Sequence, residues 1–435
     1  MFPIPHRAFP LRAALAVSVA ALLAACGSDD GTKRGEVSSD AAIATLTAAQ
    51  IDATTASPSL PIQALTGTAK CDVTVRKVVH TTAAPNGGGD GASTAVAAVL
   101  VPTPSATCAG PFPIVAYDPG TNVEKARTLA SPTAGETLLL TAFFAAQGYV
   151  VVATDYLGFS DSSLSYHPYL HAESQATTTI DAIRAASTVL ARLGVPLSGK
   201  LFLTGYSQGV HAAMATHRAI EADPSLGLTV TAAGPMSGPY NLSGSFVAGL
   251  SLLPSGTGGS TVFTPYAVTG YQKIYGNLYA TATDFFKAPY ANGIESLLPG
   301  AIAFNDLFTT GRLPLALGDL LTPRAIADVT DTTSGLRRAL DANTLLGWTP
   351  RAPVLLCGGS RDPVVLYSVN TTASAQDITA RGGRVTAIDV EQVPEFASAL
   401  PPANTPVSQL TTYHGTVVPP LCMKVVRDAL FATLR

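Results

Sequence analysis

Apolar and polar positions alternate along most of the chain in a pattern that predicts strands followed by helices. Two β-branched runs, Asp72 to His80 and Ser93 to Val101, flank a Gly-rich turn and predict a hairpin. Ala172 to Leu193 repeats apolar residues at helical spacing and predicts a long helix. The remaining predicted strands are Phe112 to Tyr117, Tyr149 to Thr154, Lys200 to Thr204, Leu228 to Ala233, Val354 to Cys357 and Arg384 to Val390. The remaining predicted helices are Ala134 to Gln147, the segment after Ser207 up to Glu221, Leu366 to Ala380 and Leu421 to Leu434.

The order of these elements predicts an α/β fold, with a mostly parallel sheet covered by helices on both faces. The region 241–345 interrupts the alternation, because it is rich in Tyr, Phe, Leu, Gly and Pro and its patterns look helical. We therefore expect a core made of residues 65–240 and 346–435, carrying a mainly helical insertion at 241–345.

The N-terminus has the features of an export signal. A basic start is followed by the uncharged apolar run Ala13 to Ala25, which is too short to span a membrane. The run ends in Leu23-Ala24-Ala25-Cys26, which resembles a bacterial lipobox and implies that residues 1–25 are cleaved and that Cys26 carries acyl chains. Gly27 favours the outer over the inner membrane; an ordinary cleaved signal peptide is the alternative. Residues 26–64 are small and polar, and we expect a flexible tether there.

Charge and cysteine content narrow the class of protein. The net charge of -3 without a basic block makes nucleic acid an unexpected partner. The composition, 13% charged and 47% hydrophobic, predicts a large buried core. No metal, nucleotide or flavin signature is present, so we expect no cofactor.

Beyond Cys26, the chain has four cysteines, and none are spaced as C-x-x-C, which argues against zinc or redox chemistry. An even count in an exported chain predicts two disulfides, and free buried thiols are the alternative. Of the three possible pairings, we prefer Cys71–Cys108 and Cys357–Cys422, because each joins elements expected to be neighbours in the fold.

The pentapeptide Gly205-Tyr206-Ser207-Gln208-Gly209 lies between a predicted buried strand and a predicted helix. Small residues on both sides of Ser207 permit a sharp strand-to-helix turn that exposes its hydroxyl. Serine needs a base, a group that orients the base, and donors for the developing oxyanion. We therefore interpret Ser207 as a nucleophile and the backbone N–H of Gln208 as an oxyanion donor, in preference to a surface Gly-Ser turn.

One histidine suits the role of base. His211 and His217 lie inside the helix that follows Ser207, and beyond that helix only His414 remains. Asp362 follows the strand Val354 to Cys357 and is the preferred acid, because its side chain is expected at the same sheet edge as Ser207. Asp389 and Glu391 compete with it, and Asp362 could instead cap the next helix.

The second oxyanion donor is expected in the loop after the third strand, at the backbone of Gly120 or Thr121; an ordinary Pro-Gly turn is the alternative. His167 and His171 have a spacing that two metal ligands on a helix would share. Pro168 argues against that helix, and we interpret both as structural or rim residues.

Several segments together resemble the secretory lipase family and its bacterial relatives, a branch of the α/β hydrolases with a large, mainly helical cap. They are Asp155-Tyr156-Leu157-Gly158, His167-Pro168-Tyr169-Leu170-His171-Ala172, the pentapeptide around Ser207, Trp348-Thr349-Pro350, and Gly359 with Asp362. The resemblance implies ester hydrolysis through an acyl-enzyme, with Ser207, Asp362 and His414 as the triad. It also implies that Asp155 and Tyr156 line or brace the site, and we place Tyr206 in the same group. The Asp-Pro-Gly loop departs from the His-Gly pair frequent in relatives.

The leading hypothesis is therefore a carboxylesterase or lipase that acts on small-molecule or lipid esters, held at the membrane of the cell envelope by its N-terminal lipid. A peptidase or polyester depolymerase could use the same triad, and a non-catalytic surface lipoprotein could share the scaffold. Aromatic residues of the insertion either shape an acyl pocket or form the insertion's own core. They are Tyr266, Tyr271, Tyr275, Tyr279, Phe285 and Phe286.

Overall fold

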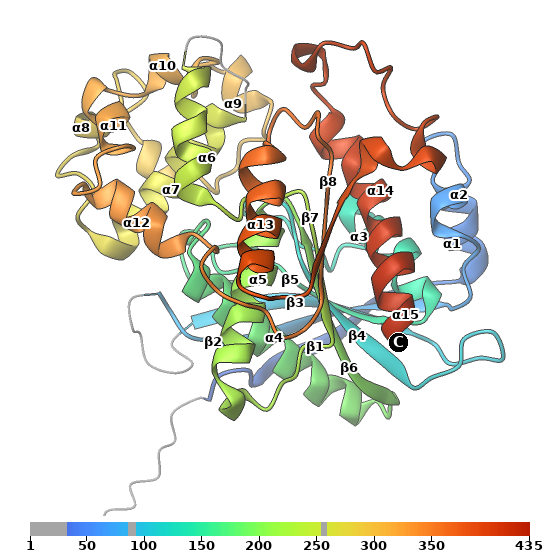
Figure 1. Ribbon diagram of the computed structural model, residues 1–435. Helices are drawn as coiled ribbons and strands as arrows, with labels where there is room; N and C mark the ends of the chain where they lie inside the picture. The colour runs from blue at the N-terminus through green and yellow to red at the C-terminus, as the bar shows by residue number, and fades with distance from the viewer. Residues whose placement is uncertain (1–32, 86–92, 254–258) are drawn as a thin grey trace, which may run out of the picture. The chain divides into compact units, whose positions relative to one another are not determined.

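A computed structural model of the chain describes residues 33–85, 93–253 and 259–435 (Figure 1). The predicted signal peptide and Cys26 lie outside the described residues. Within these residues, the strands form one sheet in the order β1-β2-β3-β5-β4-β6-β7-β8-β9. The strands are β1 (Val37–Leu46), β2 (Val73–Thr82), β3 (Ser93–Pro102), β4 (Phe112–Asp118), β5 (Val150–Thr154), β6 (Leu197–Tyr206), β7 (Ala232–Met236), β8 (Val354–Gly358) and β9 (Val385–Asp389).

The sheet has an antiparallel edge and a parallel remainder, which confirms the predicted mostly parallel sheet. β1, β2 and β3 pair antiparallel, and β3 is antiparallel to β5. In the rest of the sheet, whose order is β5-β4-β6-β7-β8-β9, each strand is parallel to its neighbours. The carboxyl ends of the parallel strands therefore meet at one rim of the sheet, where α/β folds place their ligands.

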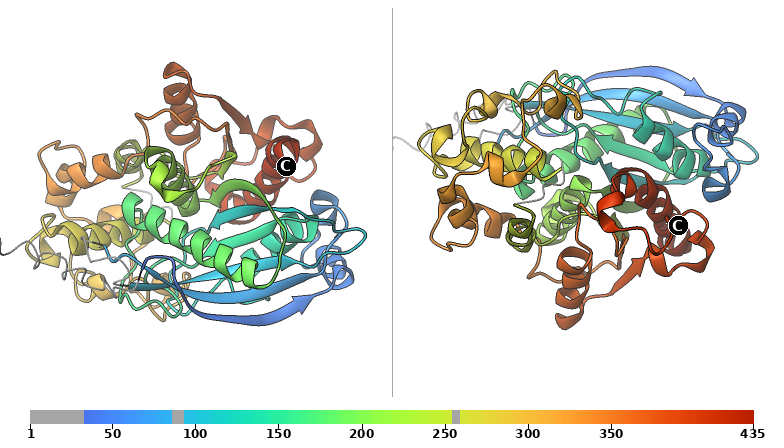
Figure 2. Two further views of the ribbon diagram at one scale, coloured as in Figure 1. Left: turned by 90° about the horizontal axis from the view of Figure 1, so that it is seen from below. Right: turned by 90° about the horizontal axis from the view of Figure 1, so that it is seen from above.

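Helices cover both faces of the sheet (Figures 1 and 2). On one face, α4 and α5 pack on the strands through a core that includes Ile183, Val189 and Met214. On the other face, α3 and the C-terminal helices pack through a second core that includes Phe143 and Phe431. The helices of this part are α1 (Ala48–Thr55), α2 (Gln63–Thr66), α3 (Gly135–Phe143), α4 (Ala172–Arg192), α5 (Gln208–Ala222), α13 (Ala373–Ala380), α14 (Val418–Val425) and α15 (Ala432–Leu434).

The flexible tether predicted at 26–64 is wrong for the described part of that range. β1 extends the edge of the sheet along β2, and Arg76 of β2 donates two hydrogen bonds to Asp40 of β1, at 2.9 and 2.8 Å. α1 follows with a capping box formed by Thr47 and Gln50. Most side chains of β1 are exposed or half-buried, so main-chain hydrogen bonds hold the strand. Because such pairing needs few apolar residues, composition alone gave no sign of it.

The insertion between β7 and β8 is helical, as predicted (Figure 1, yellow to orange). It has its own apolar core, in which Tyr266, Tyr271, Phe285 and Phe286 are buried. Tyr279 belongs to the same core, so five of the six predicted aromatic residues are core of this cap, whereas Tyr275 is exposed. The helices of the cap are α6 (Leu242–Gly249), α7 (Ser260–Tyr275), α8 (Ala282–Phe285), α9 (Asp306–Thr309), α10 (Leu317–Leu320), α11 (Pro323–Asp328) and α12 (Gly335–Asn343).

One strand lies later in the sequence than its apolar pattern predicts. The prediction placed it at Leu228 to Ala233, whereas β7 is Ala232–Met236 and contains Gly234 and Pro235. Both residue types argue against a strand when only the sequence is considered. Gly234 is required by packing, because a Cβ there would lie 2.3 Å from the side chain of Val426.

Both predicted disulfides are confirmed. Cys71–Cys108 joins the segment before β2 to the loop before β4, and Cys357–Cys422 joins β8 to α14. The second bond therefore links the strand that precedes Asp362 to the helix that follows His414.

Candidate active site

Ser207 occupies a sharp turn between β6 and α5. Its backbone has φ 55° and ψ −118°, a strained conformation typical of a nucleophile at such a turn. The turn is also tight. A Cβ on Gly205 would lie 2.2 Å from the carbonyl oxygen of Gly209, and a Cβ on Gly209 would lie 1.8 Å from that of Asp118. Both glycines are therefore required for the backbone to pass, and the turn presents the serine hydroxyl at the rim.

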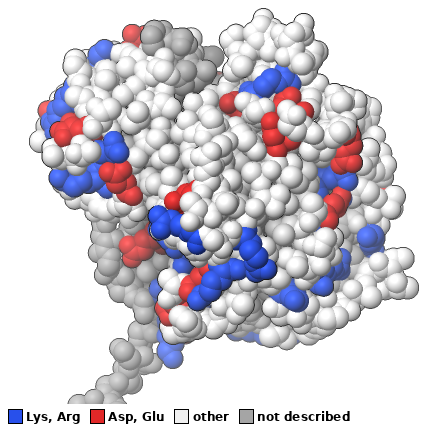
Figure 3. Space-filling view, in the orientation of Figure 1, with Lys and Arg blue, Asp and Glu red and all other residues white. Residues whose placement is uncertain are grey.

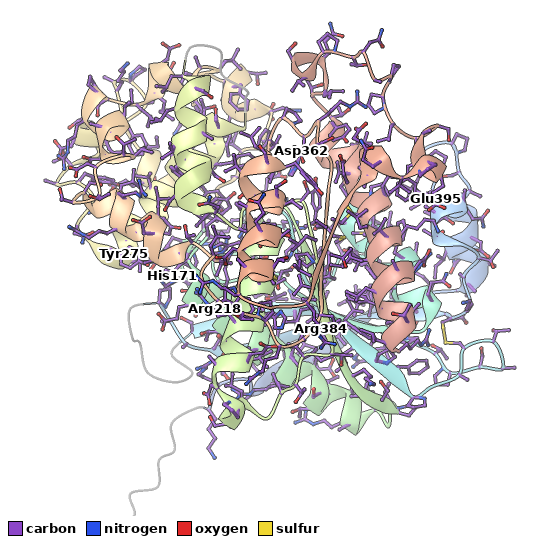
Figure 4. The ribbon with its side chains drawn as sticks, in the orientation of Figure 1. His171, Arg218, Tyr275, Asp362, Arg384 and Glu395 are labelled. Atoms are coloured by element: carbon purple, nitrogen blue, oxygen red, sulfur yellow. A yellow bond between two sulfur atoms is a disulfide. The ribbon has the colours of Figure 1, made fainter. Side chains whose placement is uncertain are left out.

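Ser207, Asp362 and His414 come from distant parts of the chain, and the structure brings them together. His414 Nε2 lies 2.9 Å from Ser207 Oγ, and His414 Nδ1 lies 2.6 Å from Asp362 Oδ2. Because an ionised carboxylate only accepts hydrogen bonds, Nδ1 carries the hydrogen and the Nε2 lone pair faces the serine hydroxyl. Figure 4 shows Asp362 near the upper end of β8, on the rim. This arrangement allows His414 to remove the hydroxyl proton.

The carboxylate of Asp362 is buried and fully engaged. Oδ2 accepts hydrogen bonds from His414 and from the hydroxyl of Ser237, at 2.6 and 2.8 Å. Oδ1 accepts the N–H groups of Val364 and Val365, at 2.9 and 3.1 Å, so Asp362 also caps the turn that follows it. Burial alone would raise the pKa of Asp362, but the adjacent His414 and these hydrogen bonds outweigh burial and lower it. Asp362 is therefore kept ionised beside His414.

Tyr206 packs against the imidazole of His414. The centre of its ring lies 5.0 Å from that of the His414 imidazole. The Tyr206 side chain is buried, and its hydroxyl has no hydrogen-bond partner among the described residues. Its contribution to the site is therefore contact with the imidazole, which restricts rotation of the ring.

Asp155 and Tyr156 brace loops next to the nucleophile. Asp155 accepts the N–H of Leu129 at 2.7 Å and the hydroxyl of Thr128 at 2.6 Å, and burial raises its pKa to about 6. Tyr156 donates its hydroxyl to the carbonyl oxygen of Pro119 at 3.0 Å. These contacts hold the loop after β4 and the segment that follows it in place.

The two candidates for the second oxyanion donor are the backbone N–H groups of Gly120 and Thr121, and one of them already has a hydrogen-bond partner. The N–H of Gly120 donates to Glu136 Oε1 at 3.1 Å, and Glu136 also forms an ion pair with Arg127. That donor is therefore already engaged, and Thr121 remains as the candidate from this loop. The backbone N–H of Gln208 lies in the first turn of α5, where amides have no partner within the helix.

A pocket leads from Ser207 into the cap. It has a volume of about 150 Å³, and Ser207 and Gln208 contribute to its wall. Side chains of the cap and of the segment after Asp362 supply most of the remaining wall. Among them are Phe246, Leu250, Phe263, Leu317, Leu321 and Val364. The pocket is therefore mainly apolar, with Ser207 at one part of its surface.

Sequence reasoning missed two residues that support the site, Ser237 and Glu136, and identified a third, His167, only as a structural or rim residue. Ser237 donates to Asp362, Glu136 holds the loop of Gly120, and His167 contacts the side chain of Gln208. The contacts of Ser237 and Glu136 span 125 and 16 positions of sequence, and no local motif marks either residue. The positive φ of Ser237, 52°, is visible only in the structure.

The remaining histidines near the site are engaged in structural contacts. His171 caps α4, and burial lowers its pKa to about 4. His211 contacts Gln175 and the carbonyl oxygen of Asn343, and burial lowers its pKa to about 3. Across the described ranges, no group of three or more His, Cys, Asp or Glu side chains is arranged to hold a metal ion.

Comparison with known proteins places the chain in a family. A profile of the secretory lipases matches residues 124–406. The chain belongs to the secretory lipase family. The rice cell wall degrading esterase LipA from Xanthomonas oryzae is 33% identical, and its structure superposes with a TM-score of 0.81 over 92% of this chain and 100% of that one. No significant match was found among curated protein sequences.

A more distant solved structure agrees in fold. Candida antarctica lipase A in its closed state is 16% identical, with a TM-score of 0.58 over 83% of this chain and 77% of that one. This secretory lipase therefore has the α/β-hydrolase fold with a helical cap, and it is an ester hydrolase of the esterase and lipase class. In the part of the chain that the structure describes, no helix combines the length and apolar character needed to cross a bilayer.

Proposed function

We propose that the protein hydrolyses carboxylic esters through an acyl-enzyme on Ser207, with His414 as the general base and Asp362 as the group that orients it. The observation that carries this proposal is the position of His414, whose two ring nitrogens contact Ser207 Oγ and Asp362 Oδ2 at the same time, at 2.9 and 2.6 Å. Family membership supports the same class of reaction.

In the first half of the reaction, Ser207 Oγ attacks the ester carbonyl carbon while His414 Nε2 takes the hydroxyl proton. The carbonyl oxygen becomes an oxyanion, and the backbone N–H groups of Gln208 and Thr121 stabilise it. As the carbon–oxygen bond to the alcohol breaks, the imidazolium returns its proton to the leaving oxygen. In the second half, His414 activates a water in the same way, and the acid is released from Ser207.

The surroundings of Ser207 favour a substrate with an apolar part. Cap residues such as Phe246 and Phe263 line the pocket, and burying a chain of methylene groups against them contributes about 0.8 kcal/mol per group. On the face shown in Figure 3, acidic and basic side chains lie in small mixed groups, with no broad surface of one sign. The described residues that line the pocket include no Asp, Glu, Lys or Arg, so an uncharged ester suits it better than a polyanion.

A panel of p-nitrophenyl esters of rising acyl length, set beside a peptide p-nitroanilide, tests the proposal. We expect turnover of the esters, with kcat/KM rising as the acyl chain extends into the pocket, and loss of turnover in Ser207→Ala. Turnover of the anilide without turnover of any ester would replace the esterase by a peptidase. Turnover of the esters that survives in Ser207→Ala would refute the assigned nucleophile.

We also propose that the protein is exported and held in the cell envelope by acyl chains on Cys26. The lipobox-like segment Leu23-Ala24-Ala25-Cys26 supports this, and the two disulfides suit an oxidising compartment. Metabolic labelling with a clickable palmitate analogue should tag the wild-type protein but not Cys26→Ala. If the wild type is unlabelled and is recovered in the soluble fraction as fully as Cys26→Ala, the lipid anchor is rejected.

A further inference from the structure

The segment His167-Pro168-Tyr169 contacts both residues that we assign to the oxyanion hole. We propose that this segment positions the hole, with His167 holding Gln208 and Tyr169 holding Thr121. This role rests on the proposed function, because it concerns the donors used in that reaction. None of the three residues of the segment touches the triad through a hydrogen bond in the described structure, so they act through the donors.

His167 holds the side chain of Gln208 in a defined direction. Its Nδ1 lies 2.9 Å from the carbonyl oxygen of Leu157, which only accepts, so Nδ1 carries the hydrogen. Nε2 then has a free lone pair and accepts the amide Nε2–H of Gln208 at 2.6 Å. Burial lowers the pKa of His167 to about 3, which keeps this neutral form over the pH range in which the enzyme works.

The contact with His167 restricts the backbone of Gln208 because of where Gln208 lies in the fold. It is the first residue of α5 and follows Ser207, whose φ is 55°. N–H groups in the first helical turn have no partner within the helix, so the helix alone does not fix the direction of this one. Fixing the buried side chain limits rotation of the peptide plane between Ser207 and Gln208. The N–H then stays aimed at the position of the oxyanion.

Tyr169 provides the second contact. Its hydroxyl lies 2.7 Å from the hydroxyl of Thr121, across 48 positions of sequence. The ring of Tyr169 also lines the pocket next to Ser207. The backbone of Gly120 is held by Glu136, and the side chain of Thr121 is held by Tyr169. Two neighbouring residues of the loop are thereby fixed.

The cap holds the segment in turn. The rings of Tyr169 and of Tyr266 in α7 are stacked, with centres 4.4 Å apart and planes 4° from parallel. Tyr271 of α7 donates its hydroxyl to the carbonyl oxygen of Leu170 at 2.9 Å. Tyr156, which follows β5 of the core, stacks on His167 with ring centres 5.3 Å apart. The segment is therefore clamped between the cap and the core, as a positioning element requires.

The stacked tyrosines offer a matched pair of variants. Tyr169→Phe removes the hydroxyl that contacts Thr121, whereas Tyr266→Phe removes a buried hydroxyl that has no hydrogen-bond partner among the described residues. Both variants keep the stacked rings. We expect kcat to fall about 10-fold in Tyr169→Phe with KM within twofold, because a misdirected donor costs less than the 10²-fold or more of a deleted one. Tyr266→Phe should match the wild type.

A double-mutant cycle tests the other contact. His167→Phe keeps the packing but removes the acceptor, Gln208→Met removes the donor, and the double variant removes both. If His167 acts through Gln208, each single variant should turn over the ester about 10-fold more slowly, and the double variant should be no slower than either. If the two residues act independently, their rate losses should multiply to about 100-fold in the double variant. His167→Gln, whose amide oxygen can accept from Gln208, should recover part of the rate.

The rate of labelling by a fluorophosphonate is the second readout for every variant, because it needs the nucleophile and the oxyanion hole but no particular ester. Thermal unfolding checks that each variant is folded; should His167→Phe not fold, Gln208→Met and Tyr169→Phe carry the test. Folded variants with kcat and labelling rates within twofold of the wild type, or effects that multiply in the cycle, would overturn the positioning role. A wild type that neither hydrolyses esters nor labels at Ser207 would overturn the proposed function as well.

Discussion

Removing each disulfide in turn distinguishes the effect of the bond on the stability of the protein from its effect on catalysis. Cys357 lies in β8, five positions before Asp362, and Cys422 lies in α14, eight positions after His414. The bond between them therefore ties the strand that carries the acid to the helix that follows the base. Cys71–Cys108 closes a loop near β2 and β4 and includes no element that carries a triad residue.

The two bonds should contribute similar amounts to stability. They close loops with sequence separations of 65 and 37 residues. In the chain-entropy model, loops of these lengths correspond to about 4.3 and about 3.8 kcal/mol of stabilisation at 25 °C, a difference of about 0.5 kcal/mol. Stability alone therefore predicts nearly equal consequences for the two losses.

Unlike the losses of stability, the losses of kcat should differ between the two disulfide variants. We compare Cys357→Ala/Cys422→Ala with Cys71→Ala/Cys108→Ala, measuring urea unfolding and, at a temperature where both are folded, kcat for a p-nitrophenyl ester. Both variants should lose similar stability, but only the first should lose kcat, by about 10-fold, because a shift of about 1 Å between acid and base costs up to 10²-fold. Equal kcat in the two variants, or a larger loss in the second, would refute the reasoning.

Three further changes test other parts of the account. Asp362→Asn should lower kcat about 10⁴-fold, because the base then lies in the wrong tautomer, whereas Asp389→Asn should leave kcat within twofold of the wild type. Asp118 is fully buried, and burial raises its pKa to about 8, so between about pH 4 and 8 the folded state keeps a proton that the unfolded state has lost. The free energy of unfolding should therefore fall as pH rises from about 4 to 8. Urea unfolding of Asp118→Asn should show a fall that is smaller by up to a few kcal/mol. Deleting residues 33–46 removes β1 and should lower the melting temperature by several degrees or more, whereas removal of a flexible tether would leave it unchanged.

That Ser207, Asp362 and His414 lie together could be predicted from sequence, because each residue has a strong local or positional signal. Ser207 lies in a glycine-flanked turn between a strand and a helix, and His414 is the one histidine beyond α5. Asp362 follows a buried strand, so the parallel order of the sheet places it on the rim with Ser207. The disulfide Cys357–Cys422 was predictable for the same reason, since β8 and the C-terminal helix are neighbours in such a sheet.

The features that were missed depend on contacts without a local pattern. β1 is an edge strand held by its main chain and by the pair of Asp40 and Arg76, and its side chains carry little apolar signal. The choice between Gly120 and Thr121 depended on Glu136, which is 16 positions from Gly120. Hydrophobicity showed that the cap is rich in aromatic residues but could not tell core from pocket, because both environments are apolar.

The rate at which a fluorophosphonate labels the protein, followed by intact mass and by mapping of the modified peptide, tests the central claim most directly. The account predicts a single adduct on Ser207, no adduct in Ser207→Ala, and labelling slowed by at least 10³-fold in His414→Ala, because the serine hydroxyl then lacks its base. An adduct on another residue, or a labelling rate in His414→Ala equal to that of the wild type, would contradict it.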